Sequence, residues 1–271
     1  MLLLKYHGTT TIPVEAECIT PDQVAGKSLA EIEALRVQHG NQQAPLSEFF
    51  TVSGDSNDQQ IVIEGDCTRV KLIGSLMTCG RITVHGNAGM HLGAEMKGGE
   101  IHVHGNAGDW VGAEMRGGRI HVHGDAGHLV GAGYRGSSVG MRGGVILVDG
   151  KAGNEIGSGM RRGLIALGGD TGDFTGAGLI AGSIFVFGQP GIRMGANMKR
   201  GTIACFGDQP HLLPTFRFDC SYRPVFLNLY LRQLRDWGFA VADEHLHGPV
   251  RRFSGDLVSL GKGEVLYWQR A

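Results

Sequence analysis

The chain lacks the features that would place it in a membrane or in an oxidising compartment. Nowhere in its 271 residues do eighteen apolar residues run together, so we expect no transmembrane helix. The five cysteines are odd in number, widely scattered and without a C-x-x-C pair, which favours reduced packing residues over disulfides. The N-terminal residues have neither a basic start nor a small-residue cleavage site. We therefore expect a soluble cytoplasmic protein.

Strong net charge and catalytic motifs are missing as well. The formal net charge of −1 argues against sequence-independent binding to nucleic acid. The chain contains no G-x-S-x-G, no H-E-x-x-H and no cysteine beside a plausible histidine. Carbohydrate-cleaving enzymes need clustered carboxylates, whereas the acidic residues here fall mostly at expected turns, where Asp has a backbone role. They are Asp66, Asp125, Asp170 and Asp173.

Glycine, in contrast, is abundant and regularly spaced. Seven of the 46 glycines recur every nineteen residues, apart from one interval that is seven residues longer: Gly86, Gly105, Gly124, Gly150, Gly169, Gly188 and Gly207. A period of this size indicates stacked copies of one small structural unit.

Each copy reads as a strand followed by glycine-rich turns. The copy at residues 105–123 is GNAGDWVGAEMRGGRIHVH, and its Ile-x-Val ending alternates apolar and polar residues with the period of a strand. Alignment of the copies places seven isoleucines in one column: Ile82, Ile101, Ile120, Ile146, Ile165, Ile184 and Ile203. We predict an all-β fold, a right-handed parallel β-helix of about seven 19-residue coils with small α/β caps at both ends.

The repeat divides the chain into three predicted parts. Residues 1–58 form an N-terminal cap with one helix near 28–39, which starts at a Ser28 to Glu31 capping-box spacing. Residues 59–207 form the repeat domain. Residues 208–271 form a C-terminal cap with an amphipathic helix from Pro224 to Trp237 and a last strand at 262–269.

The outward positions of the strands suggest two different surfaces. Five histidines alternate on adjacent strands, namely His85, His102, His104, His121 and His123. Imidazoles at strand spacing form a line rather than a tetrahedron, and no acidic residue joins these columns before Asp149, so we assign no metal ligand, although a metal on this face stays open. Further along, the same columns turn apolar at Leu147, Phe185, Phe187 and Phe206 and need a cover. A segment after Gly207 and a partner subunit are both compatible with this pattern.

A cationic row occupies another column. It consists of Lys97, Arg116, Arg142, Arg161 and Lys199, with Arg162 and Arg200 next to it. Neutralisation by the nearby Glu95 and Glu114 is one interpretation. A groove for an acidic ligand or for the edge of a partner is the other.

The seven-residue insertion, at 133–139, creates the string GAGYRG from Gly131 to Gly136. No helix follows this string, so we do not interpret it as a dinucleotide site. An outward loop that makes a specific contact is the better interpretation.

The coil pattern GNAGxxVGAxMRGGxIxVHG resembles the repeat of the formylmethanofuran dehydrogenase C-subunit family, which is shared with the C-terminal β-helix domain of glutamate synthase. A free-standing chain of this length is similar to the C subunit over nearly its full extent, and it looks closer to the bacterial formyltransferase/hydrolase complex of methylotrophs than to the archaeal enzymes.

This resemblance implies a supporting role in one-carbon metabolism. Sister subunits A, B and D, in an expected hetero-octamer, would transfer the formyl group from formyl-tetrahydromethanopterin to methanofuran and hydrolyse formylmethanofuran to formate, completing formaldehyde oxidation. The resemblance implies that the metal lies in a sister subunit, that this chain binds no cofactor, and that it carries no catalytic residue. Methanofuran variants in this family carry glutamate chains, so Lys97, Arg116, Arg142 and Arg161 are our candidates for contact with an acidic tail or a partner. The alternatives are the C subunit of a tungsten or molybdenum formylmethanofuran dehydrogenase and a stand-alone β-helix carbohydrate-active enzyme.

Overall fold

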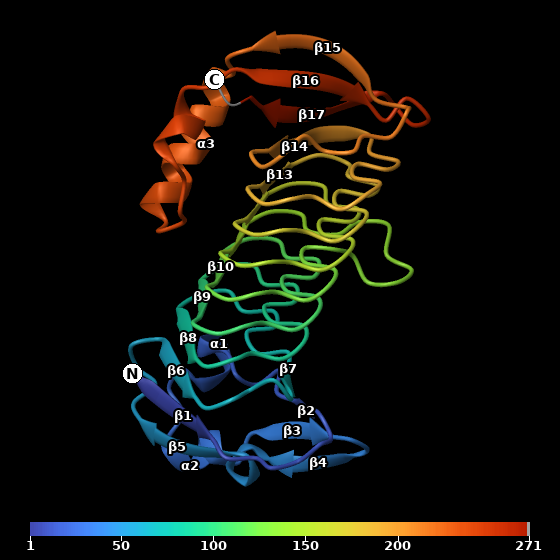
Figure 1. Ribbon diagram of the computed structural model, residues 1–271. Coiled ribbons are helices and arrows are strands. Elements are labelled where there is room, and N and C mark those ends of the chain that lie inside the picture. Colours follow the sequence, from blue (N-terminus) through green and yellow to red (C-terminus); the bar gives the residue numbers. More distant parts are fainter. Residues whose placement is uncertain (270–271) are drawn as a thin grey trace.

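A long row of parallel strands forms the body of the molecule. The computed structural model describes residues 1–269, and it shows the chain winding in stacked coils from the N-terminal end to the C-terminal end (Figure 1). Each coil places one strand in a 13-stranded sheet. The parallel strands are β6 (Gln60–Glu64), β8 (Arg81–His85), β9 (Glu100–Val103), β10 (Arg119–Val122), β11 (Val145–Val148), β12 (Leu164–Leu167), β13 (Ser183–Val186), β14 (Arg200–Cys205) and β17 (Lys262–Trp268). The all-β class predicted from the repeat is confirmed.

The isoleucine column lies in register inside the coils. Ile101 pairs with Ile120 and Ile120 with Ile146, and all seven isoleucines of the column are fully buried. A second line of parallel bridges joins Ala88, Ala107, Ala126 and Ala152 on another side of the coils. Each coil therefore contacts the next through two ladders, with the apolar side chains between them.

A glycine column accommodates the isoleucines. Gly112 has φ +61°, and a Cβ atom placed on it would lie 2.5 Å from Cδ1 of Ile146 in the next coil. Gly93 and Ile120 repeat this arrangement one coil earlier, also at 2.5 Å. The glycine is required both for its left-handed backbone and for the space that the neighbouring isoleucine fills.

The N-terminal part contributes strands to two sheets. β1 (Leu2–Tyr6) pairs in parallel with β6 and antiparallel with β5 (Phe50–Gly54), which is one edge of the large sheet. A second sheet holds β2 (Val14–Glu15), β3 (Arg36–His39), β4 (Gln42–Pro45) and β7 (Val70–Lys71). The short helices are α1 (Pro21–Val24), α2 (Leu29–Glu33) and the 3₁₀ turn η1 (Leu46–Glu48).

The single N-terminal helix predicted near residues 28–39 is too long. The Ser28–Glu31 capping box is present, but α2 ends at Glu33, and Arg36–His39 forms strand β3 instead. The cause is tertiary pairing, because β3 lies between β2 and β4 and buries Val37. Helix α1, with Thr20 as its N-cap, was not predicted.

The C-terminal part closes the other end of the sheet and covers the strands from outside. Its elements are β15 (Arg217–Tyr222), α3 (Val225–Asp236), the 3₁₀ turn η2 (Asp243–Leu246), β16 (Val250–Gly255) and β17. The predicted helix and last strand are confirmed, whereas β15 and β16, which pair antiparallel, were missed. No helix in the described part of the chain is long and apolar enough to span a membrane.

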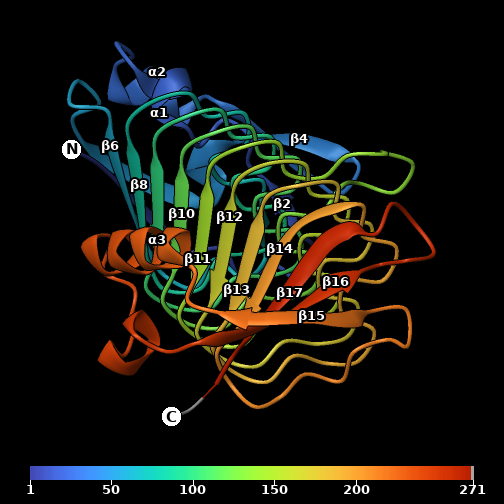
Figure 2. The same cartoon turned by 90° about the horizontal axis from the view of Figure 1, so that it is seen from above.

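Helix α3 covers the apolar columns of the outer strand face. It runs beside the row of strands, outside the coils (Figures 1 and 2). Its Leu227, Leu231 and Leu234 form one buried cluster with Leu147, Phe185 and Phe206. The segment after Gly207 therefore provides this cover within the chain itself.

Candidate functional site

The histidines form two neighbouring lines on the outer strand face. His85, His104 and His123 stack along one line, with ring centroids 4.7 and 5.4 Å apart. His102 and His121 form the other, with centroids 6.1 Å apart. The alternation predicted from the sequence is thus present, but at the end of the lines His121 and His123 approach each other to 4.1 Å between centroids.

Asp149 joins the two lines at this point. Its Oδ1 is 2.9 Å from Nε2 of His121, and its Oδ2 is 2.7 Å from Nδ1 of His123. Partial burial opposes ionisation of Asp149, but the hydrogen bonds from the two rings outweigh it and hold the pKa of the carboxyl group below its usual range. Asp149 directly follows β11, which places it one coil beyond His123.

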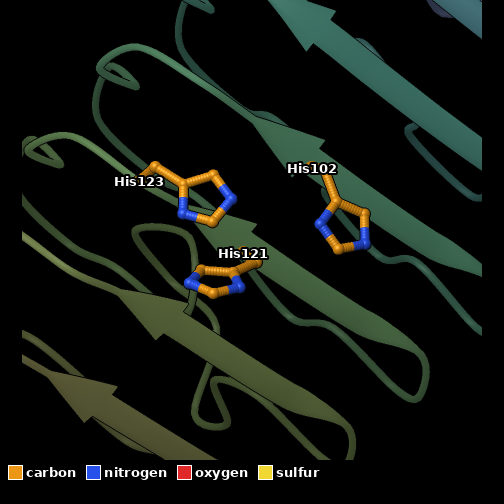
Figure 3. A group of neighbouring side chains, drawn as sticks. All are labelled: His102, His121 and His123. Carbon is orange, nitrogen blue, oxygen red and sulfur yellow. The ribbon is translucent and has the colours of Figure 1, made fainter. Parts of the chain in front are cut away.

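Three of the histidines gather as metal ligands do. One ring nitrogen each from His102, His121 and His123 lies within 4.8 Å of the others (Figure 3). The two predicted lines of imidazoles are present, and in this group they approach each other closely enough for three ring nitrogens to lie near one point. The strand spacing predicts which residues share a column, but it does not fix the side-chain rotamers. In the structure the rings of His121 and His123 both contact the carboxylate of Asp149.

Glu100 lies on the other side of His102. Its Oε2 is 3.6 Å from Nε2 of His102, and its oxygens also pair with Arg81 at 2.7 Å and Arg119 at 2.6 Å. Burial opposes the charge of Glu100, yet these partners hold its pKa below the usual range. The carboxylate is therefore a fixed acceptor beside the histidine group.

The two middle arginines of the cationic row, Arg116 and Arg142, are neutralised within the chain. Glu95 lies 3.0 Å from Arg116, and Glu114 lies 4.0 Å from Arg142, so each carboxylate pairs with the arginine one coil later. Among residues 1–269, no ion pair within 4.0 Å involves Lys97 or Arg161. Neutralisation within the chain therefore accounts for Arg116 and Arg142 but not for Lys97 or Arg161.

A groove lies beside the unpaired end of the row. It has a volume of about 340 Å³ and is lined by Arg161 and Arg162 and by Tyr230 and Trp237 of the C-terminal cap. Guanidinium groups next to aromatic rings suit an acidic segment, since charge and a flat apolar wall occur together.

The insertion at 133–139 is anchored by one aromatic residue. The hydroxyl of Tyr134 lies 3.2 Å from Nδ1 of His91, its ring contacts His91 and Trp110, and its backbone N–H donates to Glu114. Arg135 to Ser138 are exposed. The insertion is thus an outward loop fixed at its base, as the sequence suggested.

The turn carboxylates have the predicted backbone role. Oδ1 of Asp125 accepts from the N–H of Lys151, and Oδ1 of Asp170 accepts from the N–H of Gln189, in each case one coil later. Asp173 accepts from Ile192 in the same way. These acids connect turns of successive coils and do not meet in a cleft.

Comparisons of sequence with known proteins give partial matches. No family model matches the chain. It is 45% identical over 87 residues to the C subunit of the tungsten-containing formylmethanofuran dehydrogenase 2 of Methanothermobacter wolfeii, a match that covers 31% of this chain and 32% of the relative. It is 48% identical over 83 residues to the C subunit of the molybdenum-containing formylmethanofuran dehydrogenase 1 of Methanothermobacter marburgensis, covering 30% and 21%. The matched stretch thus spans a third or less of the length of these curated relatives.

A solved structure matches the entire fold. A chain of the formyltransferase/hydrolase complex (FhcABCD) from Methylorubrum extorquens, crystallised in complex with methylofuran, superposes with a TM-score of 0.91 and 33% identity, covering 99% of this chain and 100% of that one. Coiled strands with two capped ends define the class as a capped repeat protein. The chain belongs to the formylmethanofuran dehydrogenase C-subunit family, in its formyltransferase/hydrolase branch.

Proposed function

We propose that this chain is the non-catalytic, structural C subunit of a formyltransferase/hydrolase complex. The full-length structural match at 33% identity is the observation that carries the proposal. In it, sister subunits A, B and D transfer the formyl group from formyl-tetrahydromethanopterin to methanofuran and hydrolyse formylmethanofuran to formate, with the metal in a sister subunit. The assembly is a hetero-octamer.

The proposed architecture suits a supporting role. It is a right-handed parallel β-helix of about seven coils, divided into residues 1–58, 59–207 and 208–271. A stack tied by ladders and turn carboxylates resists bending, so surfaces at its two ends keep a fixed separation. Two surfaces of different chemistry lie on the outer side of the strands. One is helix α3, which covers the apolar cluster, and the other is the histidine group.

Within this assembly, the row of Lys97, Arg116, Arg142 and Arg161 contacts an acidic tail or a sister subunit. The unpaired Arg161 and the adjoining groove support this assignment more strongly than the paired Arg116 does. Electrostatic attraction of this kind speeds encounter and weakens with salt.

The setting of a tungsten or molybdenum formylmethanofuran dehydrogenase is the second candidate. The curated relatives favour it, because the stretches of 44 to 48% identity belong to the C subunits of those enzymes. The structural match covers three times as much of the chain, so the hydrolytic complex is preferred.

Purification from the native source tests the proposal. The chain, tagged at its C-terminus, is isolated under mild conditions and its native mass is measured by size-exclusion chromatography with light scattering. We expect it to elute with three other subunits and the purified assembly to release formate from formylmethanofuran without tungsten or molybdenum. Elution alone at 28.9 kDa would refute a role in any complex, whereas a pterin-bound tungsten or molybdenum would select the second candidate.

The cationic row is tested in the same assembly by charge reversal. We expect Arg161→Glu to raise the KM for a glutamate-bearing methanofuran or to release a subunit, with a loss that shrinks as salt increases. Arg217→Glu is the matched control, since Arg217 is exposed on the edge strand β15 outside the row. Equal behaviour of both variants and the wild type would remove the row from the proposal.

A further inference from the structure

We propose that His102, His121, His123 and Asp149 form a binding site for one zinc ion on this chain. The proposal does not depend on the assembly role, and it assigns a ligand to a surface for which the family resemblance implies none. It rests on four side chains that three successive coils bring together.

The donor set is one that zinc prefers. Three imidazole nitrogens and one carboxylate provide the nitrogen and oxygen ligands of a tetrahedral zinc site. The three ring nitrogens already lie within 4.8 Å of one another, and Figure 3 shows the rings gathered around one centre. Asp149 lies outside this group of three, but it has an oxygen within 3 Å of two of the rings, so it becomes the fourth ligand by turning toward His102.

Closure of the site requires only small side-chain movements. With zinc to nitrogen distances of 2.0–2.1 Å, tetrahedral ligand atoms lie about 3.3 Å apart. The nitrogens would therefore approach by up to about 1.5 Å, which rotation of the side chains about χ1 and χ2 provides while the strands stay in register. A carboxylate that now accepts from two imidazoles would exchange one of those contacts for the ion.

The surroundings fit a bound cation. Glu100 is positioned at Nε2 of His102, which leaves Nδ1 for the ion, and an outer carboxylate of this kind is a frequent partner of metal-binding histidines. The site is half-enclosed: the side chain of His121 is 3% exposed, whereas those of His123 and Asp149 are 35% and 32% exposed. An ion can thus enter from solvent on one side and find a buried ligand on the other.

The position of the site suggests what the ion does. His102 lies on β9, His121 on β10, and Asp149 directly after β11, so the ion would link three neighbouring coils. It would do so at the boundary between the histidines and the apolar cluster that α3 covers. Leu147 is the first residue of that cluster. With all four positions taken by protein, the ion is structural rather than catalytic.

Metal titration of the full 271-residue chain tests the site. Chain stripped with a chelator is titrated with Zn²⁺ against a chromophoric competitor and with Co²⁺ by visible absorption. We expect one equivalent of each, with the intense bands of tetrahedral cobalt. His123→Gln should weaken binding by more than about 100-fold, because loss of a ligand exceeds the loss caused by an outer partner.

A matched variant keeps the test independent of folding. His85→Gln alters an exposed histidine of the same face that lies outside the group, and it should bind zinc as the wild type does. Zinc should raise the melting temperature of the wild type and His85→Gln but not of His123→Gln or Asp149→Asn. Equal zinc affinity in His123→Gln and the wild type, or cobalt spectra of the hydrated ion, would overturn the proposal.

Discussion

The contact between the glycine and isoleucine columns gives a quantitative prediction. Replacement of Gly112 by Ala places a residue with a Cβ at φ +61°, which costs about 1–2 kcal/mol for an L-residue in the left-handed region. The new Cβ would also lie 2.5 Å from Cδ1 of Ile146, and displacement of a buried side chain adds about 1–3 kcal/mol. We expect Gly112→Ala to lower the free energy of unfolding by about 2–5 kcal/mol.

Gly178→Ala separates the two contributions. Gly178 also has φ +61°, but a Cβ on it would find its nearest neighbour at 3.9 Å, so only the backbone cost applies. The gain from a stiffer unfolded chain is the same for both variants and cancels in their difference. Gly112→Ala should therefore be less stable than Gly178→Ala by about 1–3 kcal/mol.

A double variant tests the contact itself. Ile146→Val removes Cδ1 and alone should cost about 0.5–1.5 kcal/mol. In the Gly112→Ala background this loss should be offset, because the methyl group that clashes is gone, so the two changes should couple by about 1 kcal/mol or more. Melting temperatures from circular dichroism measure the series, at roughly 2–4 °C for each kcal/mol. Equal melting temperatures for Gly112→Ala and Gly178→Ala, or strict additivity with Ile146→Val, would refute this account of the repeat.

Three further predictions concern the surface of the coils. Leu231→Ala, at a fully buried position on the strand-facing side of α3, should cost about 2–5 kcal/mol and increase binding of a hydrophobic dye; unchanged dye binding would contradict the role of α3 as a cover. Tyr134→Phe should lose the hydrogen bond to His91, about 1 kcal/mol, and speed proteolysis within residues 133–139, whereas an unchanged rate would show that the bond does not hold the loop. Burial raises the pKa of Cys205 to about 12, so its thiol stays protonated at pH 8. Iodoacetamide at pH 8 should therefore modify the exposed Cys220 first, and the reactivity of Cys205 should rise only toward pH 12. Peptide mass spectrometry measures both modifications, and equal reaction of the two cysteines in the folded chain would contradict this prediction.

The repeat was predictable from the sequence because its contacts are periodic. Ile120 and Ile146 occupy the same position in successive copies, and they pair in the structure. Alignment of the copies therefore predicts the strand register, despite the seven-residue insertion between these two residues. The caps offer no such help. Arg36–His39 became a strand through pairing with segments on both sides, and β15 and β16 depend on partners that no local pattern identifies.

For the histidine group too, the sequence predicts the column in which each residue lies but not the contacts that its side chain makes. Alignment placed His121, His123 and Asp149 on one face, and the structure agrees. What the alignment does not contain is the direction in which each side chain turns. Asp149 reaches diagonally to a ring in the neighbouring column as well as along its own, and this choice depends on side-chain rotamers.

The two edge strands of the large sheet, β5 and β15, both run antiparallel to their neighbours, although every contact between coils is parallel. After two reversals β15 runs in the same direction as the coil strands, whereas β5 runs against them. A second copy that extended the stack would therefore have to pair β15 with an oppositely directed β5, a junction unlike any contact between coils within the molecule.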